Sequence, residues 1–331
     1  MKPKVLVSRA IFADVIERLA EHFEVDANLR DDVWTTAQFE QRLSDKDGAL
    51  VFGEPVGATA LAQAPRLRAV SNMAVGYNNF DLEAFARHGV LGTNTPDVLN
   101  ESTADFGWAL MMSAARRVAE SERWVRAGSW QRWSHDLLLG QDVHGKTLGV
   151  IGMGRIGQAV ARRALGFDMR VVYHNRSRVE PAIESRLNAT YLDKDKLLRV
   201  ADHVILVLPL TPESRHTIGE RELRLMKPTA TLTNIARGGI VDDLALIAAL
   251  RERRIAAAAL DVFEGEPRFN AAFLELENVV LTPHTAPGSE ATRRSMAHLA
   301  ADNLIAALGC GPHAGRPANP VNPEVLAQRS H

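Results

Sequence analysis

The stretch Gly152-Met153-Gly154-Arg155-Ile156-Gly157 decides the fold of this chain. The apolar run Thr147–Ile151 before it predicts a strand, and the alanine-rich run over residues 158–165 after it predicts a helix. Three glycines at this spacing between a strand and a helix are typical of a dinucleotide-binding turn. The first glycine permits the turn, the second lets the backbone approach a pyrophosphate, and the third lets the helix pack closely on the strand. Free N–H groups at the helix start would bind the phosphates.

The residues after the next predicted strand, near Met169–Tyr173, bear on which dinucleotide is bound. NAD sites normally have Asp or Glu there, about 20 residues after the glycines, to accept hydrogen bonds from the ribose. Here the segment reads His174-Asn175-Arg176-Ser177-Arg178, with two guanidinium groups and no carboxylate. Arginine matches the geometry of a phosphate, and a missing carboxylate removes a repulsion. The sequence therefore predicts a preference for NADP(H), with NAD(H) as the alternative if the turn is merely a solvated basic segment.

Composition predicts a two-domain cytoplasmic protein without a nucleic-acid or membrane partner. The chain has 331 residues, 46% of them hydrophobic, and a formal net charge of −1. This length favours about two domains, and the near-neutral charge gives no reason to expect a polyanionic partner. No apolar run resembles a signal peptide or a membrane span. The single cysteine, Cys310, fits a reducing compartment, and no metal site is predicted.

Strand-like and helix-like segments alternate along most of the chain, which predicts an α/β fold with parallel strands. In the first block we expect strands over Lys4–Ser8, Gly48–Phe52 and Ala69–Asn72, and helices over Phe12–His22, Ala37–Leu43 and Thr59–Ala64. This block has no glycine turn of the dinucleotide type. The dinucleotide domain is therefore expected to be inserted into another domain, with Asn94-Thr95-Pro96-Asp97 marking its start.

One long helix is predicted over Ser102–Ala127, because Phe106, Leu110 and other apolar residues recur at helical spacing. Trp124, Trp130 and Trp133 follow within ten residues. Aromatic side chains of this kind suit either the protein core or a subunit interface, and the sequence alone does not separate these two alternatives.

Polar side chains follow several of the later predicted strands. These strands are expected over Val204–Leu208, Ala230–Asn234, Ala256–Asp261 and Val279–Leu281, before a last helix over Glu290–Ala307 and a loose tail. Arg237, Glu266 and His284 come after three of them. Each alone has a structural explanation, but ligands of open parallel sheets bind beyond the carboxyl ends of the strands. Together the three residues predict a reaction centre, with an arginine for a carboxylate, a histidine as acid or base, and a carboxylate to orient the histidine.

The chain resembles the D-isomer-specific 2-hydroxyacid dehydrogenase family over essentially its whole length. The family spaces its Arg and Glu 29 residues apart and its Glu and His about 18 apart, as 237, 266 and 284 do here. Within the family, Ser71–Asn79 and Asp142–Thr147 favour glyoxylate/hydroxypyruvate reductases and bacterial 2-ketogluconate reductases. The runs that carry the resemblance are Gly149–Gly157, Leu208–Glu213, Asn234–Asp242 and Leu260–Pro267.

The resemblance implies a Rossmann-type, doubly wound parallel sheet inserted into a smaller flavodoxin-like α/β substrate domain. The substrate domain would comprise residues 1–97 and 287–331, and the NADP(H)-binding domain residues 98–286. The implied activity is reduction of small 2-oxo acids, namely glyoxylate, hydroxypyruvate or 2-ketogluconate, to D-2-hydroxy acids. The implied assembly is a homodimer formed through residues 98–140.

The resemblance also implies roles for individual residues. Arg237 would hold the substrate carboxylate, His284 would protonate the carbonyl oxygen, and Glu266 would favour the protonated form of His284. Val75 and Gly76 would bind the substrate through backbone N–H groups, and Asp261 would contact the nicotinamide carboxamide. The residues expected to line the cofactor are Thr103, Gly152, Gly154, Arg155, Ile156, Gly157, Asn175, Arg176, Ser177, Arg178, Leu208, Pro209, Ile235, Ala236, Asp261 and Ala286.

Two alternatives stay open at this point. One is an NADH-preferring D-2-hydroxyacid dehydrogenase of another branch, and the other is a dinucleotide-sensing protein similar to a corepressor. The segment Thr285-Ala286-Pro287-Gly288 also departs from the Gly-Ser step that commonly follows the family's histidine. Because proline lacks an N–H group and fixes φ, contacts from this segment are expected to differ.

Overall fold

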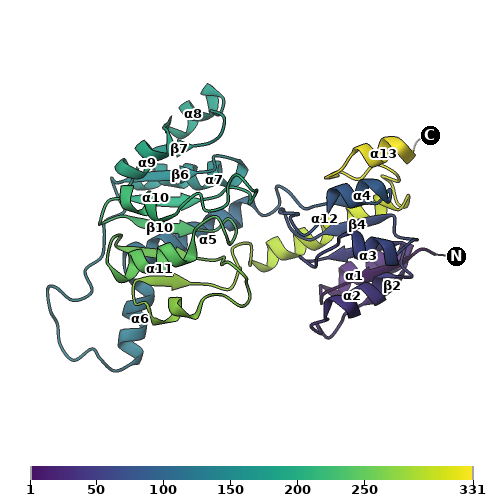
Figure 1. Ribbon diagram of the computed structural model, residues 1–331, viewed down its shortest axis with the longest axis horizontal. Helices are drawn as coiled ribbons and strands as arrows, with labels where there is room; N and C mark the ends of the chain where they lie inside the picture. The colour runs from purple at the N-terminus through teal and green to yellow at the C-terminus, as the bar shows by residue number, and fades with distance from the viewer. Residues whose placement is uncertain (1, 330–331) are drawn as a thin grey trace. The chain divides into compact units, whose positions relative to one another are not determined.

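The computed structural model describes residues 2–329, which form two compact units. The smaller unit is the chain up to Leu99 together with the chain from Ser289 onward, and the larger unit is Asn100–Gly288. Each division lies two residues beyond the domain boundary expected from the sequence. Each unit contains one parallel sheet with helices on both faces (Figure 1). The predicted fold class, α/β with a Rossmann-type sheet, is confirmed.

The sheet of the smaller unit has the strand order β2-β1-β3-β4-β5, and every neighbouring pair is parallel. This is the flavodoxin-like order. On β1, Val5 and Val7 pack toward α1 and α12, while Leu6 packs with residues of α2 and α3 on the other face. The elements of this unit are β1 Lys4–Val7, α1 Ala13–His22, β2 Glu24–Ala27, α2 Thr36–Leu43, β3 Gly48–Val51, α3 Ala58–Gln63, β4 Ala69–Asn72, α4 Leu82–Arg87, β5 Leu91–Thr93, α12 Glu290–Ala307 and α13 Glu324–Arg329.

The sheet of the larger unit has the order β12-β11-β10-β9-β6-β7-β8, again parallel throughout. The chain runs outward from β6 through β7 to β8 and then returns to β9 on the other side of β6, as in a Rossmann fold. The elements are α5 Asn100–Ala115, α6 Val118–Arg126, β6 Thr147–Ile151, α7 Arg155–Ala164, the 3₁₀ helix η1 Leu165–Phe167, β7 Arg170–His174, α8 Pro181–Leu187, β8 Ala189–Tyr191, α9 Lys194–Val200, β9 His203–Leu206, α10 Glu220–Leu225, β10 Thr231–Asn234, α11 Asp243–Arg251, β11 Ala257–Leu260, the 3₁₀ helix η2 Ala271–Glu275 and β12 Val279–Leu281.

Buried side chains on both faces hold the larger sheet between two helical layers. On β9, Val204 and Leu206 join the core beneath α9, α10 and α11, whereas Ile205 joins the core beneath α5 and α7. Successive strand residues point to opposite faces, so a strand covered on both sides is apolar throughout. The helix α5 lies so close to the sheet that a Cβ on Gly107 would be 2.7 Å from the Cδ1 atom of Ile235. In the described residues, no helix is both long and apolar enough to cross a membrane.

The prediction of one helix over Ser102–Ala127 is wrong. The helix α5 ends at Ala115, and Arg117 adopts a left-handed conformation with φ 54° before α6 begins. The carbonyl of Ala115 accepts a 2.7 Å hydrogen bond from the N–H of Gln141, a residue distant in sequence. Burial against the sheet also stops there, because α5 has buried residues along its length and α6 has none. Long-range capping and the loss of core contacts therefore end the helix.

The segment after residue 307 is more ordered than the loose tail expected. Asn322 lies beside β5, where its side chain accepts a 2.8 Å hydrogen bond from the N–H of Gly92 and donates to the carbonyl of Val90. Pro320 forms an isolated antiparallel bridge with Thr93. These contacts fix the segment around Pro320 and Asn322 to the sheet of the smaller unit.

A buried acid, Asp243, opens α11 in the larger unit. Its carboxylate accepts a 3.2 Å hydrogen bond from the N–H of Glu264, and its residue surface is 6% exposed. Burial raises the pKa of Asp243 to about 6, and the negative charges of Glu264 and Asp242 add to this effect. In unfolded chains an aspartate titrates near pH 3.9. Keeping Asp243 ionised in the folded protein therefore costs free energy above pH 6.

We predict that Asp243→Asn stabilises the protein at neutral pH. Between about pH 4 and pH 6 the folded state binds more protons at this residue than the unfolded state, so the contribution of Asp243 to stability falls as pH rises through that window. The variant should gain up to about 3 kcal/mol at pH 7 and lose this advantage near pH 4. Urea unfolding of both proteins from pH 4 to pH 8 measures the effect.

The control is Glu252→Gln, which removes an exposed carboxylate at the other end of α11. It should keep the wild-type pH profile of stability. A constant difference between Asp243→Asn and the wild type across this range would contradict the prediction.

Candidate active site

The predicted site residues of the larger unit gather at one edge of its sheet. The chain reverses its winding direction between β6 and β9, and in open parallel sheets ligands bind beyond the carboxyl ends of the strands at such a point. The residues at or just after those ends are Gly152 after β6, Asn175 after β7, Leu208 after β9, Ile235 after β10, Asp261 after β11 and His284 after β12. The fold thus brings together residues that are up to 132 positions apart in the sequence (284 − 152).

The glycine turn fits a dinucleotide. Gly152 has φ 105°, and a Cβ there would lie 2.4 Å from the carbonyl oxygen of Val207. A Cβ on Gly157 would lie 2.0 Å from the carbonyl oxygen of Gly152, so α7 packs against the turn at a distance that only glycine permits. A Cβ on Gly154, in contrast, would meet no atom within 4 Å. The turn is therefore closed toward the protein and open at Gly154, where a pyrophosphate would approach.

Two further predicted cofactor residues, Asn175 and Thr103, differ in their contacts. The side-chain oxygen of Asn175 accepts a 2.6 Å hydrogen bond from the N–H of Met153, which joins the end of β7 to the glycine turn. Thr103 on α5 is 4% exposed, and its hydroxyl finds no hydrogen-bond partner among the described residues. Thr95 and Thr233 share this feature, so the cofactor contact expected of Thr103 stays a prediction.

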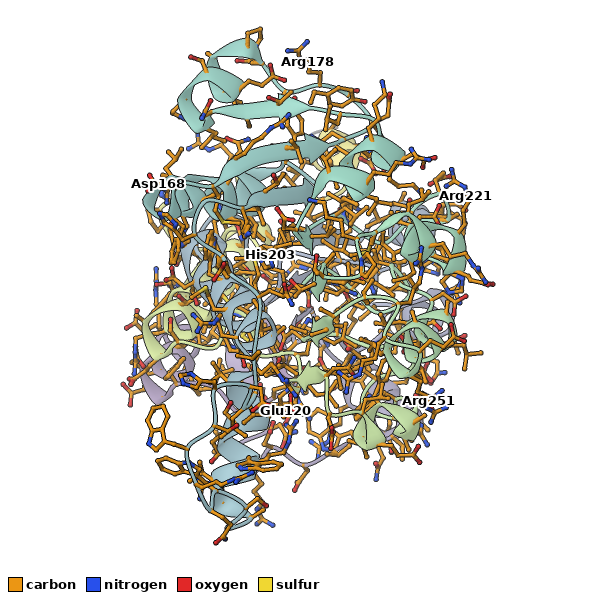
Figure 2. All side chains as sticks on the ribbon, turned by 90° about the vertical axis from the view of Figure 1, so that its left-hand side faces the viewer. Glu120, Asp168, Arg178, His203, Arg221 and Arg251 are labelled. Carbon is orange, nitrogen blue, oxygen red and sulfur yellow. The ribbon has the colours of Figure 1, made fainter. Side chains whose placement is uncertain are left out.

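The two arginines of the basic turn have different surroundings. Arg176 is exposed to solvent. Arg178 forms a bidentate ion pair with Glu184 on α8, with Nε and Nη2 2.7 and 2.6 Å from the two carboxylate oxygens (Figure 2 labels Arg178). Glu184 was not among the predicted residues, because it contacts Arg178, six residues earlier, only through the way the chain turns into α8.

His284 and Glu266 form a direct pair. The Nδ1 atom of His284 lies 2.6 Å from the Oε1 atom of Glu266. The second oxygen of Glu266 accepts a 3.0 Å hydrogen bond from the N–H of Phe263. Burial alone would raise the pKa of Glu266, but the hydrogen bond and charge of His284 outweigh burial and hold this pKa below its usual range. The carboxylate is therefore ionised, and it leaves Nε2 of His284 for another partner.

The loop that carries His284 depends on Asp261. Asp261 is fully buried, and its carboxylate accepts hydrogen bonds from the Thr282 hydroxyl at 2.6 Å and from the N–H groups of Thr285 and Ala286, each at 2.8 Å. The backbone N–H of His284 donates to the carbonyl of Asp261, and His284 has a left-handed φ of 53°. A non-glycine residue in this region is strained and is often found at functional sites. The expected contact of Asp261 with a carboxamide stays a prediction, because the carboxylate already organises this loop.

Arg237 follows β10 at the same edge. One of its terminal nitrogens donates a 2.7 Å hydrogen bond to the carbonyl of Ala236. Burial lowers the pKa of Arg237 from its ordinary value, and the negative charge of Glu266 opposes this effect. A partly desolvated guanidinium is well suited to a carboxylate ligand. Of the predicted catalytic residues, the structure thus pairs His284 with Glu266 directly and couples Arg237 to Glu266 through charge.

Val75 and Gly76 belong to the smaller unit and follow β4. Asn94 donates a 2.8 Å hydrogen bond to the carbonyl of Val75, and Asn72 donates at 2.8 Å to the carbonyl of Gly76. These bonds fix the backbone of the turn. The substrate-binding role expected of Val75 and Gly76 stays a prediction.

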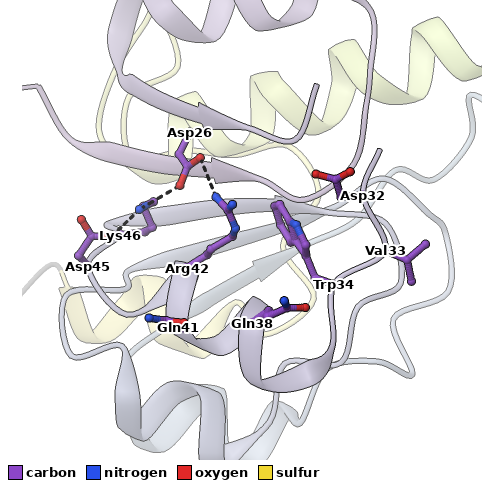
Figure 3. Close-up of a pocket in the computed structure, with 9 residues that line it drawn as sticks. All are labelled: Asp26, Asp32, Val33, Trp34, Gln38, Gln41, Arg42, Asp45 and Lys46. Atoms are coloured by element: carbon purple, nitrogen blue, oxygen red, sulfur yellow. Dashed lines mark hydrogen bonds and ion pairs between the residues drawn. The ribbon is translucent and has the colours of Figure 1, made fainter. Parts of the chain in front are cut away.

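A polar pocket of about 630 Å³ in the smaller unit contains none of the predicted site residues (Figure 3). Four of its five charged side chains are paired with one another. Lys46 is paired with Asp45 and lies 3.3 Å from Asp26, which also accepts from Arg42. The guanidinium of Arg42 in turn stacks 4.5 Å above the centre of the Trp34 ring. These internal pairs account for Asp26, Arg42, Asp45 and Lys46 without a ligand.

Comparison with known proteins places the chain in a family. Residues 108–286 match the model of the D-isomer-specific 2-hydroxyacid dehydrogenase NAD-binding domain. The chain is 48% identical to a glyoxylate reductase of Thermococcus gammatolerans over 311 residues, which cover 92% of this chain and 93% of the relative. It is 46% identical to a glyoxylate reductase of Aeropyrum pernix, with 99% and 98% covered.

Solved structures agree with this result. An NADPH-dependent glyoxylate/hydroxypyruvate reductase of Sinorhizobium meliloti, in complex with NADP and malonate, is 35% identical and has a TM-score of 0.85, with 97% of each chain covered. A protein of Thermus thermophilus is 39% identical and has a TM-score of 0.88, with 96% of this chain and 99% of that chain covered. The glycine turn, the strand order and the His284–Glu266 pair thus occur in a chain that belongs to the D-isomer-specific 2-hydroxyacid dehydrogenase family.

Proposed function

We propose that this protein is an NADPH-dependent reductase that converts small 2-oxo acids to D-2-hydroxy acids. Glyoxylate and hydroxypyruvate are the proposed substrates, with 2-ketogluconate as a larger alternative. The observation that carries the proposal is the 2.6 Å pair of His284 and Glu266 at the carboxyl edge of a dinucleotide-binding sheet. The similarity to glyoxylate reductases supports the choice of substrate class.

The residues at this edge supply what reduction of a 2-oxo acid requires. The bound dinucleotide would supply the hydride. His284, oriented and electrostatically supported by Glu266, would donate a proton from Nε2 to the carbonyl oxygen as negative charge develops there. Arg237 would bind the substrate carboxylate with its planar guanidinium. This would determine which face of the carbonyl is turned toward the hydride donor.

The proposed cofactor preference rests on Arg176 and Arg178. The residue directly after β7, where NAD sites have a ribose-binding acid, is Asn175, and Glu184 on α8 is engaged by Arg178. Arg176 is exposed, and its positive charge would attract the 2′-phosphate. The structural relative that binds NADP supports this assignment. The single cysteine, Cys310, favours a reducing compartment, so the cytoplasm is the proposed location.

A homodimer is the proposed assembly. Residues 118–139, termed the arm, comprise α6 and the segment after it, which extend away from the body of the larger unit (Figure 1). The arm buries little of its apolar surface, because Trp130 is 53% exposed, Trp133 88% and Leu139 64%. This exposure is inconsistent with the core-packing alternative for these tryptophans. Exposed aromatic side chains clustered in this way are typical of protein interfaces.

Replacing the proposed acid tests the reaction. His284→Ala should lower kcat for glyoxylate reduction by about 10²–10⁴-fold, the usual contribution of general acid catalysis. NADPH oxidation followed by absorbance gives the rate, and His144→Ala, an exposed histidine paired with Asp168, is the control. Turnover of His284→Ala near the wild-type rate would refute the assignment, and a wild type that binds NADPH without reducing any of the three acids would indicate a sensor.

The cofactor preference is tested by Arg176→Ala. The variant should lose about 10- to 100-fold in kcat/KM for NADPH, the usual value of a charged hydrogen bond to phosphate, and change little with NADH. Arg199→Ala, an exposed arginine on α9, is the matched control. Equal kcat/KM for NADPH and NADH in the wild type would disprove the preference.

The dimer is tested by removing apolar side chains from the arm. Analytical ultracentrifugation should give the wild type twice the 36.3 kDa mass of one chain. Trp133→Ser combined with Leu139→Ser should yield monomers with an unchanged circular dichroism spectrum, since these side chains are largely exposed in one chain. Leu244→Ser removes a leucine that is 71% exposed outside the arm and should leave the dimer intact. A wild-type monomer, or a dimer unaffected by the arm substitutions, would contradict this assembly.

A further inference from the structure

A buried tyrosine connects three elements beside the basic turn. Tyr173 on β7 is fully buried, and its hydroxyl donates a 2.6 Å hydrogen bond to the Oε1 atom of Glu184 on α8. The same hydroxyl accepts a 3.0 Å hydrogen bond from the backbone N–H of Val179. Val179 lies in the segment between β7 and α8 that contains both arginines. The hydroxyl therefore ties this segment to the strand before it and the helix after it.

The carboxylate of Glu184 holds Arg178 from one side. The Glu184 side chain is 9% exposed, whereas that of Arg178 is 65% exposed, so the ion pair has a buried acid and an outward-facing base. The pair uses the Nε–H group and one Nη2–H group of Arg178. A guanidinium has five N–H groups, so three remain at the edge that is not turned to Glu184. That edge has the forked geometry that binds a phosphate.

The charge of Glu184 is permanent in the physiological range. Hydrogen bonds from Arg178 and Tyr173 hold the pKa of the Glu184 carboxyl at about 2. Arg178 and Glu184 therefore form an ion pair of fixed orientation throughout the physiological pH range.

The pair has two opposite effects on a phosphate placed at its outer edge. The negative charge of Glu184 repels the phosphate, which would weaken binding. The fixed orientation of Arg178 removes the entropy cost of immobilising a long side chain at the moment of binding, which would strengthen it. Because Glu184 is buried and contacts one edge of the guanidinium, the pair presents its positive end outward. We expect the gain from orientation to exceed the repulsion.

We propose that Glu184 is a positioning residue for recognition of the cofactor 2′-phosphate, acting through Arg178 and the segment 175–179. This inference rests on the proposed NADPH preference and identifies the buried group that enforces it. The proposed role of this acid differs from the role of the acid in NAD sites. In NAD sites the acid binds the ribose directly, whereas here the acid binds the arginine that faces the phosphate.

The test is calorimetric binding of two fragments to the intact protein, 2′,5′-ADP and 5′-AMP, which differ in the 2′-phosphate. Glu184→Gln keeps the size of the side chain and breaks the ionic pair. The dissociation constant of 2′,5′-ADP should rise about tenfold, while that of 5′-AMP stays within about twofold. Tyr173→Phe keeps the buried ring and removes the hydroxyl, so it should act in the same direction with a smaller effect.

The matched control is Glu180→Gln, an exposed carboxylate at the start of α8 whose side chain makes no capping hydrogen bond. It removes the same charge from the same neighbourhood without touching Arg178. If charge alone governs binding, both glutamine variants should bind 2′,5′-ADP more tightly than the wild type. Unchanged or tighter binding by Glu184→Gln would overturn the positioning role.

The failure of this inference is distinguishable from failure of the proposed function. If the wild type binds 2′,5′-ADP no better than 5′-AMP, the NADPH preference fails and this inference with it. If the wild type does discriminate and Arg176→Ala weakens the discrimination, but Glu184→Gln does not, only the inference fails. Hydrogen exchange of residues 175–179, which needs no cofactor, should be faster in Glu184→Gln than in Glu180→Gln, and equal rates would count against the positioning role.

Discussion

The close approach of α7 to β6 is the constraint on which the larger unit depends. Because a Cβ on Gly157 would lie 2.0 Å from the carbonyl oxygen of Gly152, any side chain at this position would force the helix away from the strand. The helix start would then leave the edge of the sheet at which the other site residues lie. The open position at Gly154 is useful only because Gly152 and Gly157 close the turn on either side of it. The close packing of α7 against β6 thus determines where the cofactor site can form.

A second constraint, the buried carboxylate of Asp261, organises the opposite end of the same edge. It accepts hydrogen bonds from Thr282, Thr285 and Ala286, and so it holds the loop in the shape that gives His284 its left-handed backbone. Pro287 follows this loop directly, yet the two N–H groups that Asp261 needs come from the residues before it. The departure from the family's usual Gly-Ser step therefore leaves this anchoring intact.

The sequence predicted those features that depend on local pattern. The strands β6 and β12 and the helix α12 have the expected bounds, since apolar runs and capping residues mark them. The break between α5 and α6 escaped prediction, because the residue that caps Ala115 is Gln141. The pairing of His284 with Glu266 was predicted from their positions after strands and from the family spacing, whereas the engagement of Arg178 by Glu184 was not predicted. Which side chains pair across a turn depends on how the chain folds back. The periodicity of apolar residues in the sequence contains no information about this.

The same electrostatic arrangement occurs twice at this edge. Glu266 holds His284 through Nδ1 and leaves Nε2, and Glu184 holds Arg178 through one edge and leaves the other. In both pairs the acid is ionised and less exposed than the side chain that it holds, so the free nitrogens of that side chain face outward. The third predicted catalytic residue, Arg237, donates from a terminal nitrogen to the backbone carbonyl of Ala236, and its charge is coupled to that of Glu266.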